Sequence, residues 1–380
     1  MLDIFLSAPF AHPDILDVLF DDDTAPVSLR RATLPDHVLV EDRSGMALSL
    51  LRREGGLTEG VIVTAEAAVA ARVTFVMAAF GAETAEVPVD GADGPAVVLA
   101  HVREKAPSGP SRIAEPRNWT GERQMLLHEI VREIAGHIGE RRPGEMPALL
   151  HGICFRALAR VRGRSTDLPA VLRRSPRPGD VEVLGLQNGY AKYFGVEEHV
   201  VSHRRFDGGA SGPIERAVMV SGDGVTVVPY DPVQGTVLLI EQFRPGPHAR
   251  RDTNPWLLEP IAGRCDKLEP LDESVRREAR EEAGLELGRL VQLPGYYSTP
   301  GVCAEFLTPF IAEADLSRAG GVHGLAEEGE DIRSIVVPLE VAMEAVASGE
   351  INVGPLILSL LWLDANRSQL ARDWGASSAA

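Results

Sequence analysis

The chain has 380 residues, enough for two or three domains, and its 44% hydrophobic and 24% charged residues are typical of a globular protein. Its net charge of −17 argues against nucleic-acid polymers as partners, because a large basic surface is unlikely under that balance. No apolar run reaches the roughly 18 residues of a membrane-spanning helix, and the N-terminus lacks the charged start of a signal peptide. We therefore expect a cytoplasmic protein without a membrane partner.

The three cysteines, Cys154, Cys265 and Cys303, are scattered and show no CxxC spacing. This pattern argues against both a disulfide framework and a sulfur-ligated metal.

Residues 1–106 carry short apolar runs separated by Gly, Pro and Asp, which predicts a small α/β or β-rich domain. The runs lie at residues 3–6, 37–40, 60–63 and 96–102. Residues 105–111, KAPSGPS, have the composition of a linker, so the next segment, 107–180, is predicted as a linker followed by a helical connector.

Two helices are predicted in this connector, at residues 119–138 and 148–161, because apolar residues recur at helical spacing and prolines lie between the two stretches. The region is locally basic. A solvated helix face is the simpler interpretation of this charge, and an inter-domain or dimer contact is the alternative. The arginines concerned are Arg156, Arg160, Arg162, Arg164, Arg173 and Arg174.

Strands dominate from residue 181, and residues 181–372 are predicted as one domain followed by a flexible tail at 373–380. Residues 224–229 and 236–242 flank a turn and predict a β-hairpin. Two more strands are predicted at 306–312 and 332–338, a Gly-rich polar loop at 319–330, and two closing helices at 339–347 and 355–368.

The most informative segment is residues 263–285, GRCDKLEPLDESVRREAREEAGL. On an α-helix Glu278, Glu281 and Glu282 share one face, at positions i, i+3 and i+4. Carboxylates held together repel one another unless a cation lies between them, and oxygen-only ligands suit Mg²⁺ or Mn²⁺. Mg²⁺ commonly binds through few carboxylates plus substrate phosphates, so a phosphate-bearing substrate is expected. The alternative is a solvated Arg/Glu helix.

A glycine stands at each end of this segment. Gly284 is predicted to terminate the helix in the left-handed conformation, and Gly263 is predicted to lie in a turn before the loop that enters the helix. A solvated helix does not require both.

The segment matches the Nudix box at every fixed position, and the resemblance extends over residues 185–372. Segments such as LIEQFR at 239–244, PWLLEPIAG at 255–263 and GLAEEGEDIR at 324–333 resemble the ADP-ribose pyrophosphatase branch of the Nudix hydrolases. The resemblance implies an α/β/α sandwich with a mixed sheet and a homodimer. It also implies Mg²⁺-dependent hydrolysis of a nucleoside diphosphate substrate, ADP-ribose, to AMP and ribose 5-phosphate.

The resemblance also implies the roles of individual residues. Glu278, Glu281 and Glu282 would ligate the metal, together with the backbone carbonyl of Ala262. Arg277 would pair with neighbouring carboxylates and hold their rotamers, and Glu269 would be structural or lie in the outer shell.

In this branch the catalytic base lies outside the box. By matching the 324–333 loop, Glu328 would be the base and Glu330 a further metal ligand, and an acidic solvent loop is the alternative interpretation. Arg244 and Arg216 match positions that hold phosphate or the adenine-ribose part. Thr299 keeps a hydroxyl in the segment YYSTPG, which departs from the usual YPSPG-like loop.

The opening of the chain, DIFLSAPFAHPD, resembles the start of gamma-glutamylcyclotransferases, a family with a small β-barrel or α+β fold, but residues 7–10, SAPF, replace that family's YGTL. The pairing of the two domains resembles Nudix proteins associated with tellurite resistance. Met77 stands where the cyclotransferases have an acidic residue, and methionine cannot act as a general acid or base. We expect this domain to lack cyclotransferase activity. Overall the fold class is α/β (α+β), with a Nudix domain, an N-terminal barrel-like domain and a helical connector.

Two alternatives to ADP-ribose hydrolysis remain open from the sequence. One keeps the mechanism but takes another nucleoside diphosphate sugar or a dinucleotide. The other is a non-catalytic ADP-ribose sensor, against which the retention of Glu278, Glu281, Glu282 and Glu328 argues.

Overall fold

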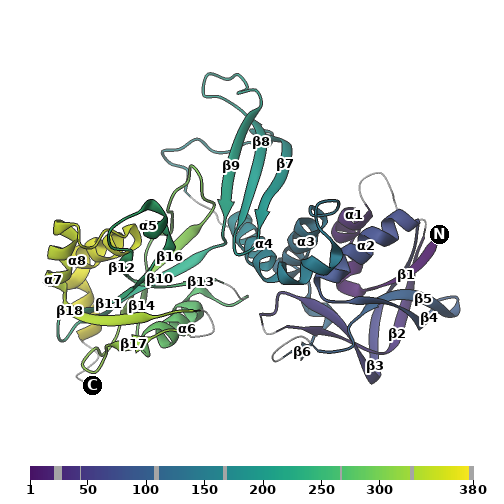
Figure 1. Cartoon of the computed structure of the whole chain (residues 1–380), viewed down its shortest axis with the longest axis horizontal. Coiled ribbons are helices and arrows are strands. Elements are labelled where there is room, and N and C mark those ends of the chain that lie inside the picture. The colour runs from purple at the N-terminus through teal and green to yellow at the C-terminus, as the bar shows by residue number, and fades with distance from the viewer. Residues whose placement is uncertain are drawn as a thin grey trace. The chain divides into compact units, whose positions relative to one another are not determined.

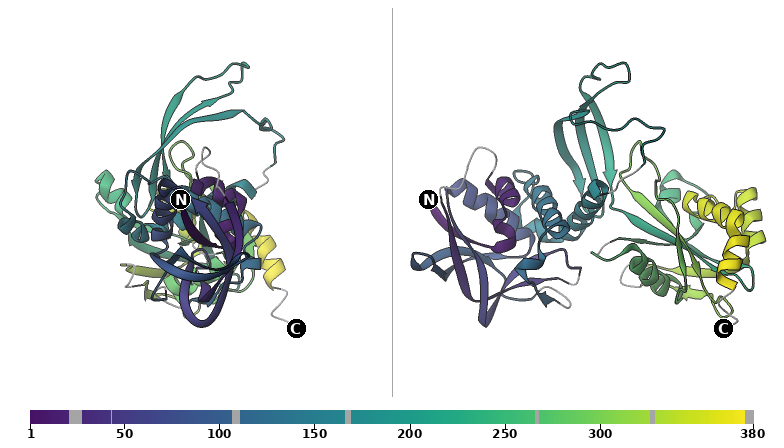
Figure 2. Two further views of the ribbon diagram at one scale, coloured as in Figure 1. Left: turned by 90° about the vertical axis from the view of Figure 1, so that its right-hand side faces the viewer. Right: turned by 180° about the vertical axis from the view of Figure 1, so that it is seen from behind.

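A computed structural model describes residues 1–20, 28–42, 44–106, 111–165, 169–265, 268–325 and 329–375. The chain divides into two compact units, each with its own core (Figures 1 and 2). Unit 1 comprises residues 1–222 and 266–268, and unit 2 comprises residues 223–265 and 269–380. None of the helices in the described ranges combines the length and apolar character needed to cross a bilayer.

Unit 1 begins with a closed five-stranded sheet, in agreement with the predicted barrel-like domain. The strand order is β3-β1-β5-β4-β2, and pairing of β2 with β3 closes the circle. β1 and β5 are parallel, whereas the other neighbours are antiparallel. The strands are β1 (Leu2–Ser7), β2 (Ser28–Glu41), β3 (Leu48–Ala65), β4 (Glu83–Gly91) and β5 (Gly94–Val102), and β6 (Arg112–Ile113) extends β2.

Helices cover one side of this barrel (Figure 1). They are α1 (Pro13–Phe20), α2 (Ala67–Ala79), α3 (Glu122–Ala135) and α4 (Leu150–Ser165), with short 3₁₀ turns η1 (Ala8–Ala11), η2 (Pro116–Asn118) and η3 (Pro143–Ala148). The two helices predicted as a connector, α3 and α4, contribute to the same hydrophobic core as α1, α2 and the inward residues of β1 and β3.

A separate three-stranded antiparallel sheet ends unit 1, with strand order β7-β8-β9 (Figure 2). Its strands are β7 (Val181–Ala191), β8 (Gly195–His203) and β9 (Ile214–Val220).

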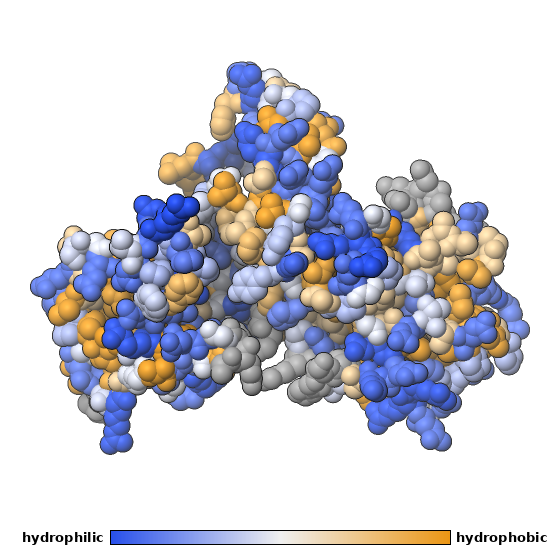
Figure 3. Space-filling view, in the orientation of Figure 1, coloured by the Kyte–Doolittle hydropathy of each residue, from blue (hydrophilic) through white to orange (hydrophobic). Residues whose placement is uncertain are grey.

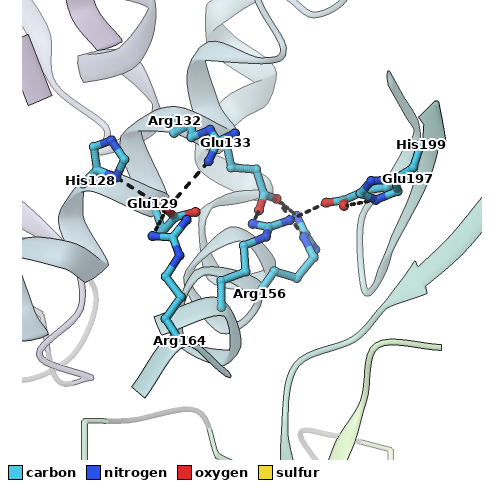
Figure 4. Close-up of polar contacts among 9 residues, drawn as sticks. His128, Glu129, Arg132, Glu133, Arg156, Arg164, Glu197 and His199 are labelled. Carbon is cyan, nitrogen blue, oxygen red and sulfur yellow. Dashed lines mark hydrogen bonds and ion pairs between the residues drawn. The ribbon is translucent and has the colours of Figure 1, made fainter. Parts of the chain in front are cut away.

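Buried ion pairs join α3, α4 and β8 (Figure 4). Arg156 is only 2% exposed, and its Nε donates to Oε1 of Glu133 at 2.7 Å. Arg160 bridges Glu133 on α3 and Glu197 on β8, and Nε2 of His199 lies 2.9 Å from Oε2 of Glu197. The solvated face predicted for the Arg-rich region is therefore wrong for Arg156, which is buried against Glu133, and for the half-buried Arg160, which pairs with acidic residues of two other elements.

Unit 2 is an α/β/α sandwich around a mixed nine-stranded sheet, as predicted. Its longest path is β14-β16-β10-β11-β18-β17, in which β10 and β16 are parallel. The strands on this path are β10 (Gly224–Asp231), β11 (Thr236–Phe243), β14 (Leu290–Gln292), β16 (Phe306–Glu313), β17 (Gly321–His323) and β18 (Ile332–Pro338). Three short strands pair at its sides: β12 (Trp256–Glu259) with β11, β13 (Ile261–Arg264) with β10, and β15 (Tyr296–Tyr297) with β16.

Alternation of side chains along the central strands separates the two faces of this sheet. Val225 and Val227 of β10 pack against α6 (Leu271–Ala283), whereas Val228 and Tyr230 pack on the opposite side. That opposite face is covered by α7 (Leu339–Ser348) and α8 (Gly354–Gly375), and α5 (Pro245–Arg250) follows β11. α8 runs past residue 373, where a tail was expected, and residues 376–380 lie outside the described ranges.

Candidate active site

The acidic face of α6 forms the centre of the candidate site in unit 2. Pro270 precedes the helix, and Gly284 ends it with φ +63°. The Gly284 N–H donates to the carbonyl oxygen of Arg280 at 3.1 Å, so the predicted left-handed cap is confirmed. The helix thereby presents Glu278, Glu281 and Glu282 from two successive turns.

Gly263 was predicted to lie in a turn. It lies instead in strand β13, where it pairs with Val225 of β10. The reason for a glycine here is steric. A Cβ at this position would lie 1.9 Å from Cδ of Glu278 and 2.0 Å from its Oε1. The strand therefore has room for the Glu278 carboxylate only because residue 263 has no side chain.

Glu282 is the most buried carboxylate of the site, at 3% exposed. Its Oε2 accepts a hydrogen bond from the backbone N–H of Ala262 at 3.0 Å, which ties the helix to β13. Burial is the largest of the causes that together raise the pKa of Glu282 to about 8. The negative charges of Glu278 and Glu330 act in the same direction, and the Ala262 N–H acts against them. Three carboxylates therefore influence one another at this point.

Arg277 contacts three carboxylates, which is the pairing that the sequence predicts for it. Its Nη1 donates to Glu278 at 2.6 Å and to Glu281 at 3.1 Å, and its Nε donates to Glu269 at 3.3 Å. Glu269 also accepts from the hydroxyl of Ser274 at 2.9 Å. Within the described residues, acidic, histidine and cysteine side chains do not form a three-ligand group ready to hold a metal. The Arg277 guanidinium instead pairs with Glu278 and Glu281.

The loop after β17 brings Glu330 toward this centre. Oε2 of Glu330 accepts from the backbone N–H of Leu325 at 3.1 Å, and the backbone N–H of Glu330 donates to the Leu325 carbonyl at 3.2 Å. A Cβ at Gly324 would lie 2.8 Å from Cβ of Glu330, so these two residues approach each other closely. Glu328, the predicted base, lies outside the described residues.

The three residues predicted to hold substrate lie in different parts of the structure. Arg244 follows β11 and its positive charge lowers the pKa of Glu282, so it belongs to the same site. Thr299 lies in an exposed turn, where its carbonyl accepts hydrogen bonds from the backbone N–H groups of Val302 and Cys303. Arg216 lies on β9 of unit 1, so the site in unit 2 is described without it.

Glu259 on β12 was not predicted as a site residue. Its Oε2 accepts from Nε of Arg244 at 2.7 Å. Burial raises the pKa of Glu259, and Arg244 and Gln242 oppose that shift. The sequence signal was a lone carboxylate inside the apolar segment PWLLEPI.

Comparison with known proteins matches the NUDIX domain to residues 220–354. The chain is 38% identical to an ADP-ribose pyrophosphatase of Haemophilus influenzae over 200 residues, which is 52% of this chain and 92% of the relative. It is 37% identical over 150 residues to a GDP-mannose pyrophosphatase of Escherichia coli, which covers 39% of this chain and 77% of the relative. Among solved structures, an ADP compounds hydrolase aligns with a TM-score of 0.39 and 21% identity, over 50% of this chain and 98% of its own. The chain therefore belongs to the Nudix family.

Proposed function

We propose that the chain is a divalent-metal-dependent diphosphatase that hydrolyses ADP-ribose to AMP and ribose 5-phosphate. The observation that carries this proposal is the acidic face of α6, where the buried Glu282 is held by the Ala262 N–H and where Arg277 holds Glu278 and Glu281. Converging carboxylates are costly unless a cation compensates them. The identity to ADP-ribose pyrophosphatases over half of the chain supports the choice of substrate.

The donor set fits Mg²⁺ or Mn²⁺, because every candidate ligand is an oxygen. The carboxylates of Glu278, Glu281, Glu282 and Glu330 would hold the ion together with the carbonyl of Ala262. When bound, the ion supplies positive charge that offsets the negative charge of the diphosphate during its cleavage.

The chain's own residues supply the remaining steps. Glu328 accepts the proton of the attacking water. Arg244 donates to the phosphate oxygens, and Thr299 contributes a further substrate contact. Arg277 holds the rotamers of Glu278 and Glu281 through the contacts described above, which keeps these carboxylates in register along the helix.

Product analysis of the purified chain tests the reaction. The panel contains ADP-ribose, GDP-mannose, other nucleoside diphosphate sugars, NADH and diadenosine polyphosphates, each with Mg²⁺ and again with a chelator. We expect AMP and ribose 5-phosphate, loss of activity with chelator, and recovery with Mg²⁺ or Mn²⁺. A preference for ADP-ribose of about tenfold in kcat/KM corresponds to about 1.4 kcal/mol of discrimination.

A second substrate is favoured by one observation, the 37% identity to a GDP-mannose pyrophosphatase. Preferred cleavage of GDP-mannose would leave the proposed diphosphate hydrolysis in place and make GDP-mannose the substrate instead of ADP-ribose. Binding of ADP-ribose without turnover of any panel member would instead support the non-catalytic sensor.

The proposal includes a cytoplasmic homodimer. The three-stranded sheet of unit 1 supports the dimer, because it carries exposed apolar side chains among polar ones (Figure 3), notably Val181, Val183, Leu186 and Tyr193. Light scattering after size exclusion should give twice the 40.9 kDa chain mass, and a single-chain mass would exclude the dimer. Three buried cysteines, none in a disulfide, are consistent with a reducing compartment.

We further propose that the barrel of unit 1 is related to gamma-glutamylcyclotransferases but inactive. Ser7, Phe10 and Met77 line one small cavity of about 20 Å³, which supports the alignment of both departures to a single former site. The cavity leaves room for little more than a water molecule. Release of 5-oxoproline from gamma-glutamyl peptides by the full chain, abolished on deleting residues 1–106, would overturn this proposal.

A further inference from the structure

Glu259 is a buried carboxylate in an otherwise apolar part of the sheet of unit 2. It ends strand β12 and lies opposite Ile240 of β11, which belongs to the core beneath α6. The register places Glu259 on the face of the sheet that carries the acidic helix. It is 9% exposed, although carboxylates are rarely buried unless they have a partner.

That partner is Arg244. The Nε of Arg244 donates to Oε2 of Glu259 at 2.7 Å, and the backbone N–H of Arg244 donates to the Pro255 carbonyl at 2.9 Å. The arginine is thus fixed to β12 at both its backbone and its Nε. Among the described residues, Glu259 is the only side chain that the Arg244 guanidinium contacts, which leaves its Nη edge available.

The position of Glu259 is electrostatically unfavourable for a residue that serves only packing. The same site already contains four carboxylates, those of Glu278, Glu281, Glu282 and Glu330. Burial of a further carboxylate at residue 259 adds a desolvation cost, which a leucine at that position would not incur. The Nε of Arg244 is taken up by Glu259, so the rest of the guanidinium plane is oriented by that contact. Glu259 therefore competes with the phosphates of a substrate for the Arg244 guanidinium, unless it orients that guanidinium toward them.

We infer that Glu259 is a positioning residue that holds the Arg244 guanidinium by its Nε and turns the Nη edge toward the diphosphate of the substrate. This inference rests on the proposed function. A guanidinium presents two parallel N–H donors on its Nη edge, which match two phosphate oxygens, and fixing the plane in advance removes the entropy cost of ordering it on binding. Glu259 acts through Arg244 and touches neither the metal nor the reacting atoms.

A double-mutant cycle on the full chain tests this inference. Glu259→Gln should raise KM about tenfold and leave kcat within about threefold, because a contact to the phosphates is made in both the ground state and the transition state. Arg244→Ala should raise KM by at least as much. In the double variant, Glu259→Gln should add less than about twofold to the effect of Arg244→Ala, since a positioning residue has nothing left to position.

The matched control is Glu241→Gln, which removes another Glu–Arg pair of the same sheet, with Arg333 at 2.5 Å. It should change KM by less than about twofold, and the melting temperatures of all variants are compared. If Glu259→Gln does not fold, Glu259→Met enters the same cycle, because an apolar chain of similar length removes the buried charge without leaving a cavity.

Two outcomes would overturn the inference. One is an equal effect of Glu259→Gln with and without Arg244. The other is a shift in the Mg²⁺ concentration for half-maximal activity, which would make Glu259 a metal ligand. If the wild-type chain hydrolyses no panel member, the proposed function fails separately. The same cycle is then measured as affinity for ADP by calorimetry, because every candidate substrate contains that kind of diphosphate.

Discussion

At the scale of single residues, Glu282 shows how one side chain meets two opposing requirements. It is buried, it accepts the Ala262 N–H, and its pKa is raised to about 8 by burial and by neighbouring carboxylates. Gln at this position keeps an acceptor oxygen but removes the charge. We expect Glu282→Gln to lower kcat at least about 100-fold at saturating Mg²⁺, since the lost charge acts in the transition state. Its melting temperature should not fall.

Steady-state kinetics at several Mg²⁺ concentrations provide the measurement. Glu286→Gln is the matched control, because Glu286 follows the same helix and pairs with Arg280 at the surface. Wild-type turnover by Glu282→Gln would remove Glu282 from the metal site.

His101 of the barrel provides a pH-dependent prediction. Burial lowers its pKa from 6.5 to about 4, and its Nε2 lies 2.9 Å from the Thr74 hydroxyl. Above pH 6.5 the imidazole is neutral in both the folded and the unfolded state. As pH falls from 6.5 to 4, the unfolded state binds the proton first, so stability is lost by up to about 3 kcal/mol. Urea unfolding between pH 7 and 4.5 measures this loss.

The variant His101→Gln should flatten the stability profile over that window, because it removes the group whose pKa is lowered by burial. Identical pH profiles for the wild-type chain and His101→Gln would show that another group carries the dependence.

At the scale of secondary-structure elements, the ion pairs of Figure 4 connect α3 and α4 to the sheet β7–β9. Removing one partner of a buried ion pair is strongly destabilising, and less so where a second partner remains. We expect Arg156→Met to lower the free energy of unfolding by about 3 kcal/mol, because the buried Glu133 keeps only Arg160 as its partner. The double variant Arg156→Met with Glu133→Gln should recover part of this loss.

Chemical denaturation followed by hydrogen exchange of β8 measures the effect. Arg132→Met is the control, because Arg132 is largely exposed and lies 3.9 Å from its acidic partner, a contact expected to contribute less than about 1 kcal/mol. Equal losses in Arg156→Met and Arg132→Met would mean that the buried pairs do not hold these elements together.

At the scale of the whole molecule, local patterns predicted more than long-range ones. The hairpin around residues 230–235 and the helix that ends at Gly284 follow from neighbouring residues, and both were found. The burial of Arg156 depends on Glu133, which lies 23 residues away, so helical spacing alone could not indicate it. The position of Gly263 in a strand was not predicted for the same reason. A glycine is required there because the Glu278 side chain of another element occupies the space of a Cβ. The closure of the barrel by β2 and β3 likewise depends on a register that no local pattern specifies. In the site, the acidic helix face could be predicted, but the partner of Arg244 could not.

The division into two units leads to a prediction about the whole chain. Each unit has its own hydrophobic cores, and the proposed metal site lies within unit 2. Because ligands stabilise only the folded region that binds them, Mg²⁺ with a methylene-bridged ADP-ribose analogue at about 100 times Kd should add about 2.7 kcal/mol to unit 2. For a unit of this size the shift is about 5–10 °C. Differential scanning calorimetry should show two transitions, of which only one moves.

The Arg156→Met variant identifies the other transition, because its substitution lies in unit 1 and should lower only that melting temperature. The two perturbations therefore act on different transitions if the units unfold independently. A single transition that both the ligand and the substitution displace would mean that the chain unfolds as one cooperative body. In that case a ligand held in unit 2 would also stabilise the barrel of unit 1, which would give that barrel an energetic connection to the proposed reaction.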